Sequence, residues 1–182
     1  MAFPAFLDTC TVFGGTLNDL FLTIAETRTY RPLWSTGVLD ELERNLLKRG
    51  LAQSAVDRRI NAMRGGFPDA EIRGYEDLIP QMTCDTDDRH VLAAAIRGDA
   101  AVLVTFNLRH FPAESLERYD IAAIHPDEFL LDQLDLHQAT TCQAVRNLVS
   151  AYENPPLTTS ALLAQLERAG VPKFAKTVGR LL

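Results

Sequence analysis

Residues 84–111, CDTDDRHVLAAAIRGDAAVLVTFNLRHF, constrain the fold more than any other stretch of the chain. Three acidic residues in four positions precede an alanine-rich apolar run with helical spacing. This run ends at Gly98, where we expect the left-handed residue that often follows a helix. Residues 100–105, AAVLVT, are too few for a helix and mostly apolar, as a buried parallel strand is. The stretch therefore predicts a helix followed by a strand, with polar residues at the start of the helix and at the end of the strand.

These polar residues occupy the two places where open α/β sheets carry functional groups, the N-termini of helices and the carboxyl ends of strands. Asp85 and Asp88 lie at the predicted helix start, where Asp85 or Thr86 can serve as the N-cap. Thr105 and Asn107 lie at the end of the predicted strand. We therefore expect the two aspartates, Thr105 and Asn107 to face one crevice.

Strand and helix candidates alternate along the first 130 residues. The strand candidates are residues 2–7, 30–34, 100–105 and 121–124, and the other helix candidates are residues 17–26, 36–49 and 53–63. Alternation of this kind implies right-handed crossovers between parallel strands, so we expect an α/β/α sandwich around a central parallel sheet. From Pro126 onward the pattern contains helices alone, interrupted by an Asn-Pro-Pro linker at residues 154–156. We predict one domain at residues 1–130 and an all-helical appendage at residues 131–182.

Two further places carry carboxylates with an ambiguous role. Asp8 closes the first strand candidate, where it could take part in chemistry or cap the next helix. Glu41 and Glu43 lie on opposite edges of the buried stripe of the helix at residues 36–49, and helical periodicity does not choose between them.

Composition excludes several classes of protein. Of the residues, 47% are hydrophobic and 23% are charged, as in an ordinary globular protein, and no stretch has the ~20 consecutive apolar residues of a membrane span. We therefore expect a cytoplasmic protein without a membrane partner. The three cysteines are scattered and form no C-x-x-C pair, which argues against a disulfide framework and a structural zinc site.

The segment DTDDRHVLAAA followed by LVTFNLRHF resembles the C-terminal half of a PIN domain, the ribonuclease fold of VapC-type toxins. FPAFLDTCTVF is similar to the opening strand of that family with its first catalytic aspartate, and LDELERNL is similar to its glutamate-bearing helix. The resemblance covers roughly the first 130 residues. It implies a PIN-like fold, a Mg²⁺ or Mn²⁺ cofactor, and cleavage of RNA phosphodiester bonds by the toxin of a type II toxin–antitoxin pair.

The resemblance also assigns roles to individual residues. It implies Asp8, Glu41 and Asp88 as catalytic metal ligands and favours Glu41 over Glu43, because the family's acid immediately precedes a core leucine. Asn107 would complete the catalytic site, although many PIN domains carry aspartate at that position. Asp85 and Thr105 would have supporting roles. Side-chain chemistry, apart from the resemblance, makes Arg89 and Arg109 candidates for contact with the RNA phosphates, because guanidinium pairs bidentately with phosphate, and His110 beside Arg109 is a further candidate.

The same resemblance implies partners. They are an RNA substrate, which could be tRNA, rRNA or mRNA, and an antitoxin protein, and a homodimer is also compatible with it. The net charge of −6 is unusual for an RNA-binding protein, and an acidic metal site explains part of it. The appendage carries no cluster of acids, so we expect it to function through contacts with other molecules. Docking of a partner protein is favoured over guidance of the RNA.

Two rival functions remain open. The first is a PIN-like module that binds RNA or a partner through a degraded site, and Asn107 is the residue that supports it. The second is a phosphatase of the haloacid-dehalogenase type, which also begins with an apolar strand and a D-x-D element. Here Cys10 stands where the second aspartate of that element would act as general acid, which disfavours the phosphatase.

Overall fold

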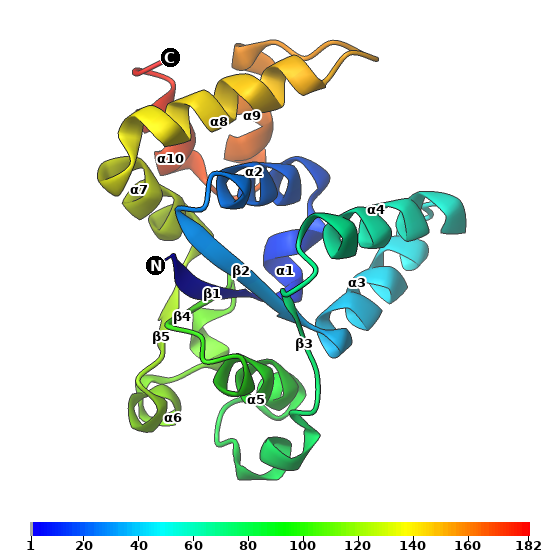
Figure 1. The fold of residues 1–182 in the computed structure, drawn as a ribbon, viewed down its shortest axis with the longest axis vertical. Coiled ribbons are helices and arrows are strands. Elements are labelled where there is room, and N and C mark those ends of the chain that lie inside the picture. Colours follow the sequence, from blue (N-terminus) through cyan, green and yellow to red (C-terminus); the bar gives the residue numbers. More distant parts are fainter. Residues whose placement is uncertain (1) are drawn as a thin grey trace.

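The computed structural model of the protein describes residues 2–182, and a five-stranded, all-parallel sheet forms its centre (Figure 1). The strands are β1 (Phe3–Leu7), β2 (Tyr30–Ser35), β3 (Glu71–Ile72), β4 (Val102–Val104) and β5 (Ala122–Ile124), in the order β3-β2-β1-β4-β5. In β1, the central strand, Phe6 pairs with Leu33 of β2 and with Leu103 of β4, and all three side chains are buried. The predicted α/β/α architecture with a parallel sheet is confirmed.

Helices cover both faces of this sheet. Those that precede residue 126 are α1 (Thr9–Phe13), α2 (Gly15–Glu26), α3 (Thr36–Lys48), α4 (Gln53–Gly66), α5 (Arg89–Arg97) and α6 (Ala113–Leu116). Short 3₁₀ turns are η1 (Glu76–Gln81), η2 (Thr86–Asp88), η3 (Leu108–His110) and η4 (Glu117–Tyr119). Figure 1 shows α2 on one side of the sheet, α5 and α6 on the other, and α3 and α4 beyond one end of it.

The boundaries of α3 follow from its sequence. The Ser35 hydroxyl accepts a hydrogen bond from the backbone N–H of Val38 at 3.1 Å, which caps the helix. The apolar side chains at helical spacing, Val38, Leu39, Leu42 and Leu46, are all buried. Because these buried side chains fix the rotation of α3 about its own axis, the acidic residues beside them have defined directions relative to the sheet.

Gly98 differs from its predicted role, because its φ is −82° and Asp99 adopts the left-handed conformation instead, with φ 53°. The requirement for glycine comes from packing. A Cβ atom at residue 98 would lie 3.0 Å from side-chain atoms of Ile72 and 3.1 Å from Leu33 Cδ1. Aspartate tolerates the left-handed region better than most residues do, so the turn can form one position later.

Other boundaries also differ from the predictions. The extra helix α1 begins directly after β1, before the first helix that the apolar spacing indicated. Helix α4 continues through Gly65 and Gly66, beyond its predicted end at residue 63. Helical spacing does not report either feature, because α1 is too short to show a stripe and the glycines lie at an exposed helix end.

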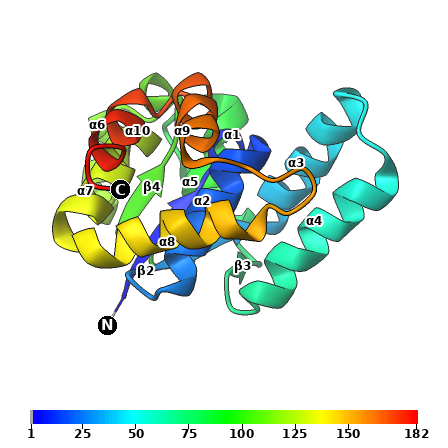
Figure 2. The same cartoon turned by 90° about the horizontal axis from the view of Figure 1, so that it is seen from above.

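The C-terminal helices are α7 (Pro126–Leu136), α8 (Gln138–Ala151), α9 (Thr159–Arg168) and α10 (Pro172–Val178). Figure 2 shows α8 lying along α2, and the two helices are in contact. Phe129 of α7 stacks on Phe21 of α2, with 5.5 Å between ring centroids, and meets Tyr30 of β2 edge-on at 5.0 Å. The predicted boundary after residue 130 therefore falls inside a helix that shares the core of the sheet, and the division into domains stays a prediction.

The carboxylate of Asp127 fixes the last helix. It accepts hydrogen bonds from the backbone N–H groups of Lys173 at 3.1 Å and Phe174 at 2.8 Å, in the first turn of α10. The Asn-Pro-Pro segment connects α8 to α9, as expected of a linker. Within residues 2–182, no helix is both long enough and apolar enough to cross a membrane.

Candidate active site

Asp8, Glu41 and Asp88 line one cavity of about 260 Å³. They come from three elements: the end of β1, the middle of α3, and the end of η2 where α5 begins. Asn107, just beyond β4, lines the same cavity. The structure thus brings together the four residues that the family resemblance assigned to catalysis.

Asp8 is the most buried acid of this group, with 3% of its surface exposed. Its carboxylate accepts hydrogen bonds from the Thr105 hydroxyl at 2.7 Å, the Cys10 thiol at 3.0 Å and the Thr9 backbone N–H at 2.7 Å. Burial raises the pKa of Asp8, the hydrogen bonds from Thr105 and Cys10 oppose that rise, and the negative charge of Asp88 adds to it. Asp8 is also the N-cap of α1, so the same carboxylate caps a helix and lines the cavity.

The structure separates the two glutamates of α3. Glu41 Oε2 accepts a hydrogen bond from the Thr9 hydroxyl at 2.8 Å, which ties it to the residue after Asp8. Glu43 faces a different cavity and accepts a hydrogen bond from Gln53 Nε2 at 2.8 Å. Glu41 is therefore the glutamate placed beside Asp8, in agreement with the family pattern.

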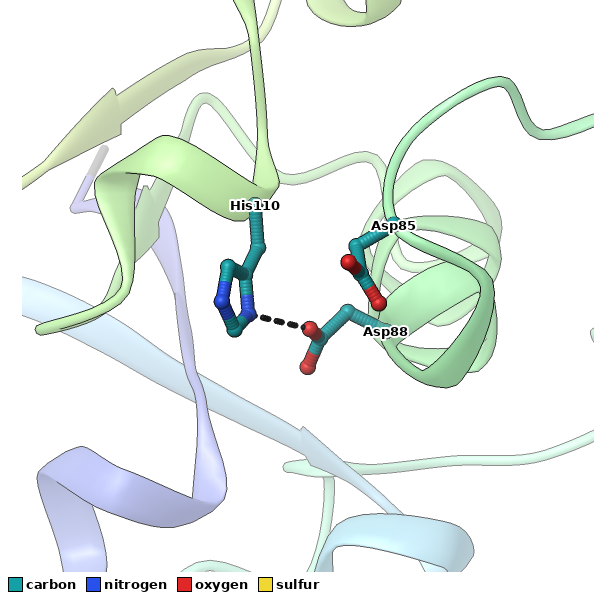
Figure 3. A group of neighbouring side chains, drawn as sticks. All are labelled: Asp85, Asp88 and His110. Atoms are coloured by element: carbon teal, nitrogen blue, oxygen red, sulfur yellow. Dashed lines mark hydrogen bonds and ion pairs between the residues drawn. The ribbon is translucent and has the colours of Figure 1, made fainter.

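Asp88 pairs with His110, as Figure 3 shows. Its Oδ2 atom lies 2.7 Å from His110 Nδ1, and one ligand atom each from Asp85, Asp88 and His110 fall within 4.8 Å of one another. Asp85 caps η2 by accepting from the Asp87 backbone N–H at 3.1 Å. The sequence did not indicate the pair, because it joins the start of α5 to the loop after β4 and no local spacing reports such a crossing.

Thr105 is fully buried and links two parts of the site. Its hydroxyl donates to Asp8 Oδ2 and accepts from the Asn107 backbone N–H at 3.0 Å. Asn107 is thereby held by the same hydroxyl that orients Asp8. This geometry matches the expectation that Thr105 orients a neighbouring carboxylate.

The predicted phosphate contacts lie outside this cavity. Arg109 is exposed, and its Nε donates to His110 Nε2 at 3.4 Å, while Arg89 is half-buried. An adjoining cavity of about 320 Å³ brings Arg44 and Lys48 of α3 beside Glu41 and Asp88. Arg44 was missed by the sequence reasoning, although its position one turn from Glu41 on the same helix was a usable signal.

The donor set of the cavity fits a hard divalent cation. Mg²⁺ and Mn²⁺ prefer oxygen ligands, and Asp8, Glu41 and Asp88 offer carboxylates from three rigid elements. Among the described residues, the lining of this cavity includes no lysine or arginine that would neutralise these acids. Burial, with a smaller contribution from the negative charge of Asp88, raises the pKa of Asp8.

Cys10 is a further residue of the cavity, to which the resemblance gave no role. Its thiol donates to Asp8 Oδ2, and its sulfur accepts from the Phe106 backbone N–H at 3.3 Å. Burial and the negative charge of Asp8 raise the pKa of this thiol to about 12, from an ordinary value of 9.0.

We expect Cys10 to resist alkylation in the folded, metal-free protein. At pH 8, three pKa units reduce the thiolate population about a thousandfold, and the thiolate is the nucleophile. Mass spectrometry after timed iodoacetamide treatment should show slow labelling of Cys10 in buffer and fast labelling in urea, with free cysteine as the reference. Fast labelling of the folded protein would contradict the hydrogen-bonded, buried thiol.

Comparison with known proteins gives two family matches. A family model described as a PIN domain matches residues 4–109, and one described as the VapC50 C-terminal domain matches residues 126–180. The putative ribonuclease VapC50 of Mycobacterium tuberculosis (strain ATCC 25618 / H37Rv) is 49% identical over 116 residues, which are 64% of this chain and 68% of that protein. No solved structure gives a significant match.

Proposed function

The chain belongs to the PIN-domain family, with a VapC50-type C-terminal region, and on this premise we propose that it is a metal-dependent endoribonuclease. The observation that carries the proposal is the cavity in which Asp8, Glu41 and Asp88 converge without a basic side chain among its described lining residues. The similar protein's name describes a putative ribonuclease, which supports RNA as the substrate.

In this proposal Asp8, Glu41 and Asp88 hold one or two Mg²⁺ or Mn²⁺ ions. Such an ion supplies neutralisation of phosphoryl charge and activation of the attacking water. Thr105 keeps the Asp8 carboxylate in place through its 2.7 Å hydrogen bond. The Asn107 amide, which carries no charge, is suited to donate a hydrogen bond to a phosphate oxygen.

The phosphate backbone of the RNA needs positive charge near this acidic cavity. Arg44 and Lys48 provide it from the adjoining cavity, on the same helix as Glu41. Electrostatic attraction by these residues is independent of base sequence and weakens with added salt. They therefore supply binding of the strand, while the acids supply cleavage.

The test is cleavage of a labelled RNA by the purified protein during titration with Mg²⁺ or Mn²⁺. We expect cleavage that depends on the ion, stops with EDTA, and is absent from an Asp8→Asn variant. Binding of RNA without cleavage at any metal concentration would favour the degraded PIN-like module. Asn107 supports that alternative, because many PIN domains carry aspartate at this position. Hydrolysis of p-nitrophenyl phosphate would favour the phosphatase, although a Cys10 thiol with a pKa of about 12 is a poor general acid at neutral pH.

We also propose that the protein is the toxin of a type II toxin–antitoxin pair. A free ribonuclease damages its own cell, and carboxylates that line a cavity without a lysine or arginine among its described lining residues can accept one from an inhibitor in place of the metal. Expression of this chain alone should arrest growth, and co-expression of the product of a neighbouring gene should restore it. Normal growth without any such product would instead indicate a housekeeping nuclease.

A further inference from the structure

His110 contacts both Asp88, which lines the cavity, and Asp85, and Figure 3 shows the three residues side by side. Its ring atom Nδ1 lies 2.7 Å from Asp88 Oδ2, and its backbone carbonyl accepts a hydrogen bond from the Asp85 backbone N–H at 3.0 Å. His110, in the 3₁₀ turn η3 that follows β4, therefore contacts the acidic turn that precedes α5. The separation of 22 residues between His110 and Asp88 makes this a tertiary contact.

Both ring nitrogens of His110 are occupied. Nε2 accepts a hydrogen bond from Arg109 Nε at 3.4 Å, and an acceptor nitrogen carries no proton in the neutral ring. A carboxylate only accepts hydrogen bonds, so Nδ1 is the donor toward Asp88 Oδ2. With Nδ1 bonded to Asp88, the ring is arranged to hold a carboxylate.

The backbone around the imidazole is well fixed. His110 ends η3, and its N–H donates to the Asn107 carbonyl at 2.9 Å. The next residue, Phe111, is 3% exposed and belongs to the hydrophobic core. A ring attached to such a support restricts the orientation of the Asp88 side chain, and it contacts one of the two carboxylate oxygens of a residue that lines the cavity.

We propose that His110 is a positioning residue, which orients the Asp88 carboxylate for metal binding. The inference deepens the proposed function and rests on it. Carboxylates that bind metals are commonly held by a second hydrogen bond, and loss of that bond weakens metal affinity by about 10- to 100-fold. The imidazole thus acts on the metal through Asp88, in place of the contact with RNA phosphates that we expected from the sequence.

The test measures binding of Mn²⁺ in the absence of RNA, by isothermal titration calorimetry on the full chain. His110→Ala should raise the dissociation constant for Mn²⁺ by about 10- to 100-fold. His110→Asn should restore most of the affinity, because the asparagine side chain places an N–H donor close to the position of Nδ1. His110→Gln should not restore it, because the glutamine amide extends toward the position of Nε2.

Two measurements keep the result specific. His137 is exposed at the end of α7, so His137→Ala is the matched control for loss of an imidazole and should bind Mn²⁺ like the wild type. Near-ultraviolet circular dichroism should show that every variant keeps the packing of its aromatic residues. In RNA cleavage, the half-saturating Mn²⁺ concentration of His110→Ala should rise by the same factor as the dissociation constant, while the rate at saturating Mn²⁺ stays close to that of the wild type.

The possible failures are distinguishable. Equal Mn²⁺ affinity of wild type and folded His110→Ala would overturn the role of His110 and leave the metal site intact. Failure of His110→Asn to rescue affinity would also overturn it, since a hydrogen-bond donor at that position would then be insufficient. A wild-type protein that binds no Mn²⁺ and cleaves no RNA would overturn the proposed function and this inference together.

Discussion

Asp8→Asn should lower metal-dependent RNA cleavage by at least about a hundredfold, because a catalytic ion supplies several kcal/mol of transition-state stabilisation. The same substitution should raise the melting temperature of the metal-free protein. Asp8 is buried, and its raised pKa shows that folding disfavours the charged carboxylate. Asparagine has nearly the same shape and no charge, so it removes this cost and keeps an oxygen for the Thr9 N–H.

The effect on stability has a defined dependence on pH. The folded protein holds the Asp8 proton more tightly than the unfolded chain, whose carboxyl titrates near 3.8. The wild type therefore loses stability as the pH rises from 3.8 through the raised pKa of the folded state. The advantage of Asp8→Asn is complete above that folded-state pKa and disappears below 3.8, where both states are protonated.

Thermal denaturation in EDTA at several pH values measures this dependence. For a chain of this size, each kcal/mol corresponds to about 2–4 °C in melting temperature. Asp40→Asn, an exposed position on α3, is the matched control and should change stability by less than about 0.5 kcal/mol. An Asp8→Asn protein with a lower melting temperature and normal cleavage per folded molecule would show that Asp8 is structural.

Phe174→Ala should destabilise the whole protein by about 3–5 kcal/mol, the usual cost of removing a buried phenylalanine. Phe174 of α10 is fully buried and its N–H is bonded to Asp127 of α7. Phe129 of α7 in turn stacks on Phe21 and meets Tyr30 of β2 edge-on, so the loss is transmitted to the sheet. The free energy of unfolding of a domain is only about 5–15 kcal/mol, so this substitution removes a large part of it.

Urea denaturation followed by tryptophan fluorescence measures the loss, because Trp34 lies in β2, away from the substitution. The control is Lys176→Ala, an exposed position on the same helix, which should change stability by less than about 0.5 kcal/mol. Two separate transitions, with the fluorescence of Trp34 unaffected by Phe174→Ala, would show that the C-terminal helices fold independently.

This packing also changes how the role of the C-terminal helices is best tested. Truncation after residue 154 would remove Phe174 together with α9 and α10, so it would damage the core as well as any docking surface. Substitution of exposed residues, such as Lys176 and Arg180, leaves the core intact. Weaker binding of an inhibitor by such variants would support docking, and weaker binding of RNA would support guidance.

The sequence was sufficient for the architecture because its signals are local. Alternating apolar strands and amphipathic helices predicted the parallel sheet, and the end of β1 was recognisable from residues next to one another. The pairing of Asp88 with His110 and of Asp8 with Thr105 joins residues 22 and 97 positions apart, and no periodicity encodes the fine geometry of such pairs. The choice of Glu41 over Glu43 came from family resemblance, because both flank the same apolar stripe.

Gly98 shows that sequence patterns have the same limit for backbone conformation, because they do not report contacts between distant segments. A glycine after a helix suggests a left-handed turn, yet its lack of a side chain serves the approach of Ile72 and Leu33. Ile72 and Leu33 belong to β3 and β2, and the sequence around Gly98 does not indicate that these strands lie beside it. The residue type was informative, whereas the physical reason for it depended on tertiary structure.

The hydrogen bond between Thr16 and Gln165, 2.7 Å long, joins residues 149 positions apart and closes α9 onto α2. Contacts of such long range slow folding, because the intervening chain must be ordered before they form. During synthesis, α2 leaves the ribosome long before α9 and α10, and until then the surfaces that those helices cover stay open to water. The nascent polypeptide thus completes this part of its hydrophobic interior only after α10 has left the ribosome.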